Sequence, residues 1–184
     1  MQILIFGFQR SGTTLLRRIV NLHPNIKRVF HEQLVLNKLR GNKRFLNIFL
    51  ENAGIDIKND NWGEKVPYYH KAKSHNPINY LKLWFKTFSR YGIVIHIIRH
   101  PYDVAFSTLE KYNNKKSISG PLKVYKRAVS NVIDELDGND RVLTIKYEDL
   151  LLNPDDTIYK IYEFCRVNPN INFRKKMLKI ENIR

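Results

Sequence analysis

The first residues of the chain constrain its fold more than any other segment. An apolar, β-branched run over residues 2–6 ends at a glycine, and residues 13–22 carry apolar side chains at helical spacing. Between them lies a polar loop, Gly7 to Gly12. A strand, a glycine loop and a helix in this order direct backbone N–H groups and the positive end of the helix dipole at an anion. The chain is therefore predicted to begin with a phosphate-binding unit.

This loop has the glycine spacing of a nucleoside triphosphatase loop but lacks the other parts of that site. Thr13 stands where G-x-x-x-x-G-K-[ST] has its lysine. The most apolar predicted strand, residues 93–98, is followed by Arg99 and His100, with no carboxylate for Mg²⁺ at that junction. These features favour a smaller anion bound without a metal. The predicted binding groups are Gln9, Arg10, Ser11, Gly12, Thr13 and Thr14.

Further strands and helices are predicted to alternate along the chain. The patterns predict strands over 93–98 and 141–146 and helices over 79–90, 122–136, 155–165 and from Pro101 onward. Residues 33–51 are predicted to form one or two helices with a candidate break at Gly41, and residues 54–64 a loop. The alternation predicts an α/β fold, a single domain over 1–184 with a mainly parallel central sheet flanked by helices.

A second anion motif follows the apolar strand over 93–98. Arg99 lies just past that strand, at the edge where open parallel sheets bind ligands. Ser107 comes eight residues later, about two turns into a helix that begins near Pro101. An arginine and a hydroxyl can together bind a phosphate monoester. Taken alone, the pair is equally compatible with a surface ion-pair residue and an ordinary helix-face residue.

These blocks together resemble the PAPS-dependent sulfotransferase superfamily, which uses 3′-phosphoadenosine-5′-phosphosulfate (PAPS). Residues 7–16 resemble its 5′-phosphosulfate loop, and residues 98–107 its 3′-phosphate motif. Tyr147-Glu148-Asp149-Leu150 with Asn153-Pro154 is similar to a segment near the end of many family members. Leu22-His23-Pro24 is similar to a segment of the bacterial and tyrosylprotein branches. The resemblance implies a P-loop-NTPase-like fold and in-line, metal-free sulfuryl transfer from PAPS to a hydroxyl or amine. It also implies nucleotide contacts from Arg99, Ser107 and Tyr147.

The resemblance implies cationic side chains for the transfer step. Arg10 occupies the position at which the family has a lysine or arginine, and it would neutralise the leaving phosphate. Lys65, in the segment Gly63 to Pro67, resembles the lysine of the Glu-Lys-x-Pro segment of carbohydrate sulfotransferases. It would contact the transferring group or an acidic acceptor. A solvent-exposed lysine is an equally good interpretation of Lys65 from the sequence alone.

The base that accepts the acceptor's proton has more than one candidate. Glu32 lies at nearly the interval from the loop that the resemblance implies for this base, and a one-residue offset makes His31 the alternative. His70 is the next candidate. Histidine suits this task near neutral pH, whereas a glutamate needs a raised pKa or a concerted transfer.

Composition limits the partners without naming the acceptor. The 32 Lys and Arg residues against 17 Asp and Glu give a formal charge of +15, which favours an acidic or carbohydrate-like acceptor. No helix-turn-helix, zinc or RNP-type signature supports nucleic-acid binding. With Cys165 as the only cysteine and no apolar run of membrane-spanning length, we expect a cytoplasmic protein. The sequence does not determine the oligomeric state. It leaves two alternatives to an active sulfotransferase: a P-loop kinase or NTPase, and an inactive protein that binds the nucleotide.

Overall fold

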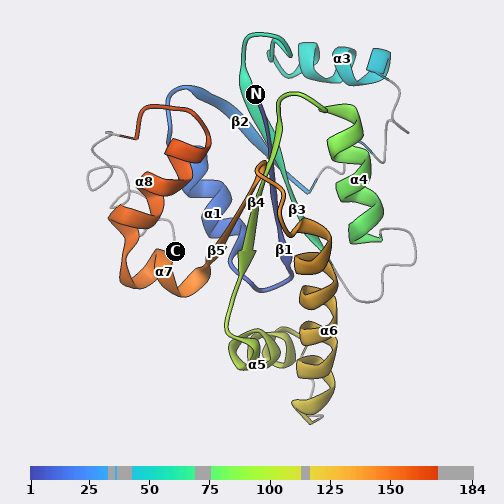
Figure 1. Ribbon diagram of the computed structural model, residues 1–184, viewed down its shortest axis with the longest axis vertical. Helices are drawn as coiled ribbons and strands as arrows, with labels where there is room; N and C mark the ends of the chain where they lie inside the picture. The colour runs from blue at the N-terminus through green and yellow to red at the C-terminus, as the bar shows by residue number, and fades with distance from the viewer. Residues whose placement is uncertain (33–35, 37–42, 69–75, 113–116, 170–184) are drawn as a thin grey trace.

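The computed structural model describes residues 1–32, 36, 43–68, 76–112 and 117–169, and these form a single α/β domain (Figure 1). Strands and helices alternate, which confirms the predicted fold class. In chain order the elements are β1 (Gln2–Phe8), α1 (Thr13–Val20), β2 (Ile26–His31), α3 (Lys43–Asn52), β3 (Asn61–Tyr68), α4 (Pro77–Thr87), β4 (Gly92–Ile98), α5 (Pro101–Lys111), α6 (Ser119–Leu136), β5 (Val142–Lys146), α7 (Tyr147–Leu152) and α8 (Pro154–Phe164).

The described strands form a five-stranded sheet in the order β2-β3-β1-β4-β5. Every neighbouring pair is parallel, so the carboxyl ends of all these strands lie at one edge. β1 is central and fully buried, as expected for an apolar strand covered by helices on both faces. The loop after β1 therefore opens at the middle of the carboxyl edge, between the carboxyl ends of β3 and β4.

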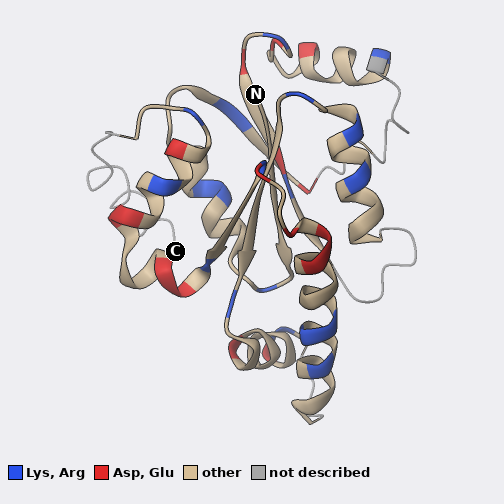
Figure 2. Ribbon diagram, viewed as in Figure 1, with Lys and Arg blue, Asp and Glu red and all other residues tan. Residues whose placement is uncertain are grey.

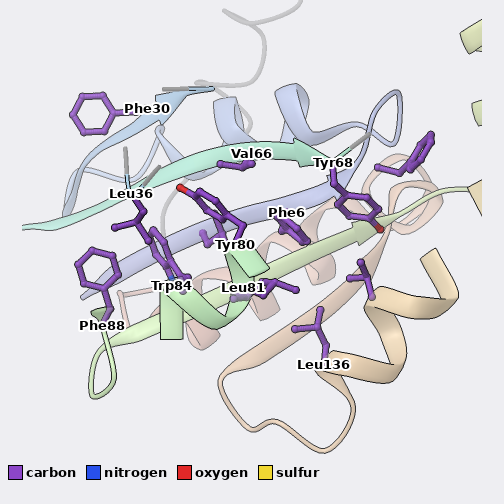
Figure 3. Close-up of a cluster of buried hydrophobic side chains, with 14 of the residues drawn as sticks. Phe6, Phe30, Leu36, Val66, Tyr68, Tyr80, Leu81, Trp84, Phe88 and Leu136 are labelled. Atoms are coloured by element: carbon purple, nitrogen blue, oxygen red, sulfur yellow. The ribbon is translucent and has the colours of Figure 1, made fainter. Parts of the chain in front are cut away.

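Each face of the sheet has its own hydrophobic core. On one face, α3, α4 and α6 pack against the sheet around aromatic side chains that include Phe6, Tyr80 and Trp84 (Figures 1 and 3). On the other face, α1, α7 and α8 cover residues such as Ile5 and Ile95. In the described part of the chain, no helix is long and apolar enough to cross a membrane.

The prediction of a loop over residues 54–64 is wrong from Asn61 onward, where β3 begins. β3 is an inner strand, buried along nearly its whole length, yet it contains Glu64, Lys65 and Pro67. Because an inner parallel strand normally has an apolar sequence, these residues prevented β3 from being predicted. β2 and α7 were not predicted at all. β2 has two exposed basic residues in its first half and lies at an edge of the sheet, so it also lacks an apolar run.

The remaining predicted elements differ from the structure only at their ends. β1 continues to Phe8, two residues into the predicted loop, and α1 ends at Val20 rather than Leu22. The predicted helical segment 33–51 is described at residue 36 and from residue 43, where α3 begins, while Gly41 lies outside the described residues.

Candidate active site

The loop between β1 and α1 follows a tightly constrained path. Arg10 has φ of 69° and Gly12 has φ of 93°, both in the left-handed region. A Cβ atom at Gly12 would collide with the ring of Tyr147, and one at Gly7 would lie 2.7 Å from the Ile97 carbonyl oxygen. Glycine is needed at position 12 for its conformation and for the close approach of Tyr147. The loop is therefore packed closely against Ile97 and Tyr147.

The N-terminal end of α1 lies at the carboxyl edge of the sheet, directly after the loop that follows β1. Gly12 is its N-cap residue and provides no side-chain cap, and the first turn contains no acidic residue. The first N–H groups of a helix have no partner within the helix, and the helix dipole adds partial positive charge there. Thr13 is buried and Thr14 is exposed at this end. The donors at this site fit a phosphate or sulfate group.

Arg10, Arg99, Ser107 and Tyr147, predicted from separate segments, lie together in the structure. The Nε atom of Arg10 donates a hydrogen bond to Ser107 Oγ at 2.8 Å, and Nη1 of Arg99 donates to the Arg10 carbonyl oxygen at 3.3 Å. The Arg99 guanidinium lies 4.5 Å from the centre of the Tyr147 ring. Its Nε atom lies 3.8 Å from Asp103 Oδ2, which is too long for a hydrogen bond. The two motifs thus form one cationic site.

Lys65 lies at the centre of a second polar cluster. Its Nζ atom donates to Glu32 Oε1 at 2.5 Å and to Thr14 Oγ1 at 3.3 Å, and it lies 3.3 Å from His31 Nε2. The Lys65 side chain is only 2% exposed, so the interpretation of Lys65 as a solvent-exposed lysine is wrong. Burial lowers the pKa of Lys65, and the ion pair with Glu32 opposes that shift. Burial, followed by the nearby charge of Lys65, also lowers the pKa of His31.

The register of β2 and β3 explains this cluster. His31 is paired with Lys65 across the two parallel strands. Glu32 follows directly, with φ of 49°, and its N–H donates to the Lys65 carbonyl oxygen at 3.0 Å. This left-handed residue ends the strand while the Glu32 carboxylate reaches Lys65 Nζ. The third base candidate, His70, lies outside the described residues.

Comparisons with known proteins identify the family. The family model described as "Sulfotransferase domain" matches residues 1–182. The chain belongs to the sulfotransferase family. No curated protein matches it.

Solved structures share the fold of this sulfotransferase chain at low sequence identity. A sulfotransferase from Alicyclobacillus acidocaldarius is 18% identical with a TM-score of 0.68, over 92% of this chain and 82% of the other. The sulfotransferase domain from the Synechococcus PCC 7002 olefin synthase is 19% identical with a TM-score of 0.63, over 94% and 78%. Mouse sulfotransferase SULT7A1, complexed with PAP, is 15% identical with a TM-score of 0.63, over 97% and 62%.

Three residues near the sulfotransferase motifs were not predicted from the sequence. The Tyr125 hydroxyl bonds to the backbone of Arg99. The Tyr112 hydroxyl donates to Gln9 Oε1 at 3.3 Å, and Glu148 Oε1 accepts from the His100 N–H at 2.8 Å. Tyrosines at helical spacing ordinarily indicate packing, so no sequence signal separates Tyr125 from a core residue. Glu148 belongs to the Tyr147–Leu150 block, which was the available signal.

Proposed function

We propose that this sulfotransferase transfers a sulfuryl group from PAPS to a hydroxyl or amine acceptor, as a single catalytic domain over residues 1–184. The observation that carries the proposal is the contact between the two anion motifs, in which Arg10 reaches Ser107 and Arg99 reaches Arg10. A nucleotide with phosphate groups on both its 3′ and 5′ positions offers one anion to each motif. The PAP bound to the mouse sulfotransferase, which is 3′-phosphoadenosine-5′-phosphate or 3′,5′-ADP, is such a nucleotide.

Each motif takes one end of that nucleotide. The glycine loop and the first turn of α1 would hold the 5′-phosphosulfate through backbone N–H groups and the hydroxyls of Ser11, Thr13 and Thr14. Arg99 and Ser107 would hold the 3′-phosphate through charge-assisted hydrogen bonds. Gln9 and Tyr147 complete the proposed nucleotide contacts, since Gln9 lies within the loop and Tyr147 lies against Gly12 and Arg99.

The Lys65 cluster supplies the groups that the transfer step needs. PAPS supplies an activated sulfuryl group, and the attacking acceptor forms a new S–O or S–N bond as the S–O bond to the 5′-phosphate breaks. Arg10 would neutralise the negative charge that develops on the leaving phosphate oxygen, and Lys65 would contact the transferring sulfuryl group or an acidic acceptor. Glu32 would take the acceptor's proton, with His31 as the alternative base because both contact Lys65. No metal is required for these roles.

Basic side chains beside the Lys65 cluster support an acidic or carbohydrate-like acceptor. Nη1 of Arg17 donates to the Val29 carbonyl oxygen at 3.2 Å, which places this arginine between α1 and β2. Burial, followed by the charges of Arg18 and Arg28, lowers the pKa of Arg17. Figure 2 shows Lys and Arg positions on both α1 and β2. The positive charge of Arg17 is close enough to help lower the pKa of His31 and the pKa of Lys65. Positive charge on this border would attract an anionic acceptor.

Nucleotide binding and transfer are tested in two steps. Thermal melting should show a larger rise in Tm with 3′,5′-ADP than with ATP and Mg²⁺, and ligand linkage predicts about 2.7 kcal/mol at a hundredfold excess over Kd. An equal or larger shift with ATP and Mg²⁺ would favour a kinase or NTPase. A mass-spectrometric screen with PAPS and paired acidic and neutral acceptors then tests transfer. Binding of 3′,5′-ADP without any sulfated product would favour an inactive nucleotide-binding protein.

For the cellular location we propose the cytoplasm, on the basis of the single cysteine. Because Cys165 is the single cysteine of this sequence, an oxidising compartment could form no intrachain disulfide in it. Cys165 is also buried in the core. Fractionation of the producing cells tests this location.

A further inference from the structure

The hydroxyl of Tyr125 makes two hydrogen bonds to the backbone of a single residue. It donates to the carbonyl oxygen of Arg99 at 2.5 Å and accepts from the Arg99 N–H at 3.1 Å. Tyr125 lies on α6, in a helix to which no anion motif was assigned, and its side chain is only 3% exposed. A buried hydroxyl bonded on both sides to one peptide backbone fixes the position of that backbone.

Arg99 needs this support because it lies beyond the sheet. The pairing of β4 with β1 ends at Ile97, and its pairing with β5 ends at Ile98. The backbone N–H and carbonyl groups of Arg99 therefore have no strand partner in the described sheet. Backbone polar groups at such a position need other partners, and the Tyr125 hydroxyl satisfies both.

The ring of Tyr125 extends the same support to the glycine loop. It packs edge-on against Phe8, with ring centres 5.2 Å apart, and Phe8 is the last residue of β1 before the loop. Aromatic pairs in this geometry have a preferred orientation. Burial raises the pKa of Tyr125, while hydrogen bonding to the Arg99 backbone opposes that shift, so the hydroxyl stays protonated near neutral pH. One side chain thus contacts the start of both anion motifs.

We infer that Tyr125 is a positioning residue, which holds the Arg99 backbone at a fixed place relative to the glycine loop so that both phosphate ends of the nucleotide bind together. The inference rests on the proposed function, in which Arg99 binds the 3′-phosphate. Tyr125 acts through Arg99 and has no proposed contact with the nucleotide. Its loss should therefore reduce selectivity for the 3′-phosphate and leave binding of the 5′ end unchanged.

Tyr125→Phe tests the inference, with Tyr162→Phe as the matched control. Tyr162 is also buried, and its hydroxyl donates to the backbone carbonyl oxygen of Ile19 at 2.6 Å. This hydrogen bond joins α8 to α1 and does not involve Arg99. Isothermal titration calorimetry should give Kd for 3′,5′-ADP and for 5′-AMP with each variant. Tyr125→Phe should reduce the preference for 3′,5′-ADP over 5′-AMP by about five- to tenfold, the value of one or two lost hydrogen bonds. Tyr162→Phe should retain the wild-type preference.

The outcomes separate this inference from the proposed function. If the wild-type protein shows no preference for 3′,5′-ADP, the proposed function fails. If that preference exists and Tyr125→Phe retains it in full, the inference is overturned. In the Arg99→Ala background, Tyr125→Phe should have no further effect on 3′,5′-ADP affinity, and an undiminished effect would also overturn the inference. Should Tyr125→Phe fail to fold, hydrogen exchange at the wild-type Arg99 amide decides: protection supports the inference, and exchange at the rate of an exposed amide overturns it.

Discussion

The Nε atom of Arg10 lies 2.8 Å from Ser107 Oγ, and this hydrogen bond joins the glycine loop after β1 to the helix after β4. The sequence predicted the two residues as parts of separate anion motifs, 97 positions apart. Because Arg99 also donates to the Arg10 carbonyl oxygen, the loop and the 3′-phosphate motif share one network. Ser107 Oγ accepts from Arg10, so its own O–H remains available to donate to a ligand phosphate, because a hydroxyl is both an acceptor and a donor.

Arg99→Ala should separate the two ends of the nucleotide. We expect Kd for 3′,5′-ADP to rise about 10- to 100-fold, from the loss of about 1.5–3 kcal/mol of charge-assisted hydrogen bonding, with a much smaller change for 5′-AMP. Titration calorimetry with both nucleotides measures the difference. Arg141→Ala is the control, because Arg141 also donates to a backbone carbonyl and stacks on an aromatic ring, but at Ser89 and Phe85. Equal losses for both nucleotides would place the 3′-phosphate elsewhere.

Glu32→Gln should separate catalysis from binding. The amide keeps the shape of the side chain but cannot accept the proton, so turnover with a verified acceptor should fall about a hundredfold or more. Affinity for 3′,5′-ADP should stay nearly unchanged. Steady-state kinetics and calorimetry measure the two quantities.

His31→Ala is the matched control for the base, since His31 also contacts Lys65. Normal turnover by Glu32→Gln together with an inactive His31→Ala would make His31 the base. If neither substitution slows the reaction, His70 is the next residue to replace.

Lys65 should set the alkaline limb of the pH profile. Burial lowers its pKa below the ordinary value of 10.5, so Lys65 loses its proton at a lower pH than an exposed lysine. If the charge of Lys65 is needed for transfer, turnover should decline as the pH rises, and this decline should be centred at a pH below 10.5. Lys65→Arg should move this limb upward, because arginine stays protonated to a pH above about 12. Lys82→Arg, at an exposed ion pair with Glu135, should leave the profile unchanged, and an alkaline limb that ignores Lys65→Arg would exclude this role.

His96 should make the protein sensitive to acid. It is fully buried, its Nε2 atom lies 3.1 Å from the Tyr68 hydroxyl, and burial lowers its pKa from 6.5 to about 4. Between these two pH values the unfolded chain binds a proton that the folded chain does not, so the free energy of unfolding falls as pH falls from 6.5 toward 4.

The loss should approach about 3 kcal/mol, at 1.36 kcal/mol for each pH unit of the shift. Urea unfolding of the wild-type protein and of His96→Gln at pH 7 and pH 4.5 measures it. His96→Gln keeps a polar group for Tyr68 and should lose less stability on acidification. An equal loss in both proteins would assign the acid sensitivity to other groups.

The sequence located the strand ends that carry Arg10 and Arg99 better than it located the whole sheet. β1, β4 and the helices after them carry clear apolar periodicity, so Arg10 and Arg99 were placed correctly at strand ends. β3 was missed because Glu64 and Lys65 interrupt it, and the burial of Lys65 follows from its pairing between β1 and β2. The role of Tyr125 depends on a contact between α6 and the end of β4, which no local pattern encodes. The proposed roles of the site residues remain predictions.

The close packing of Gly12 against Tyr147 has a consequence for sequence variation. The tyrosine ring occupies the space that a side chain at position 12 would need, and the same ring lies beside the Arg99 guanidinium. Positions 12 and 147 should therefore vary together among related chains: a residue larger than glycine at position 12 requires both a smaller residue at position 147 and a backbone at position 12 outside the left-handed region. Such a chain would lose the aromatic face beside Arg99, so we expect exchange at these two positions to coincide with a different mode of 3′-phosphate recognition.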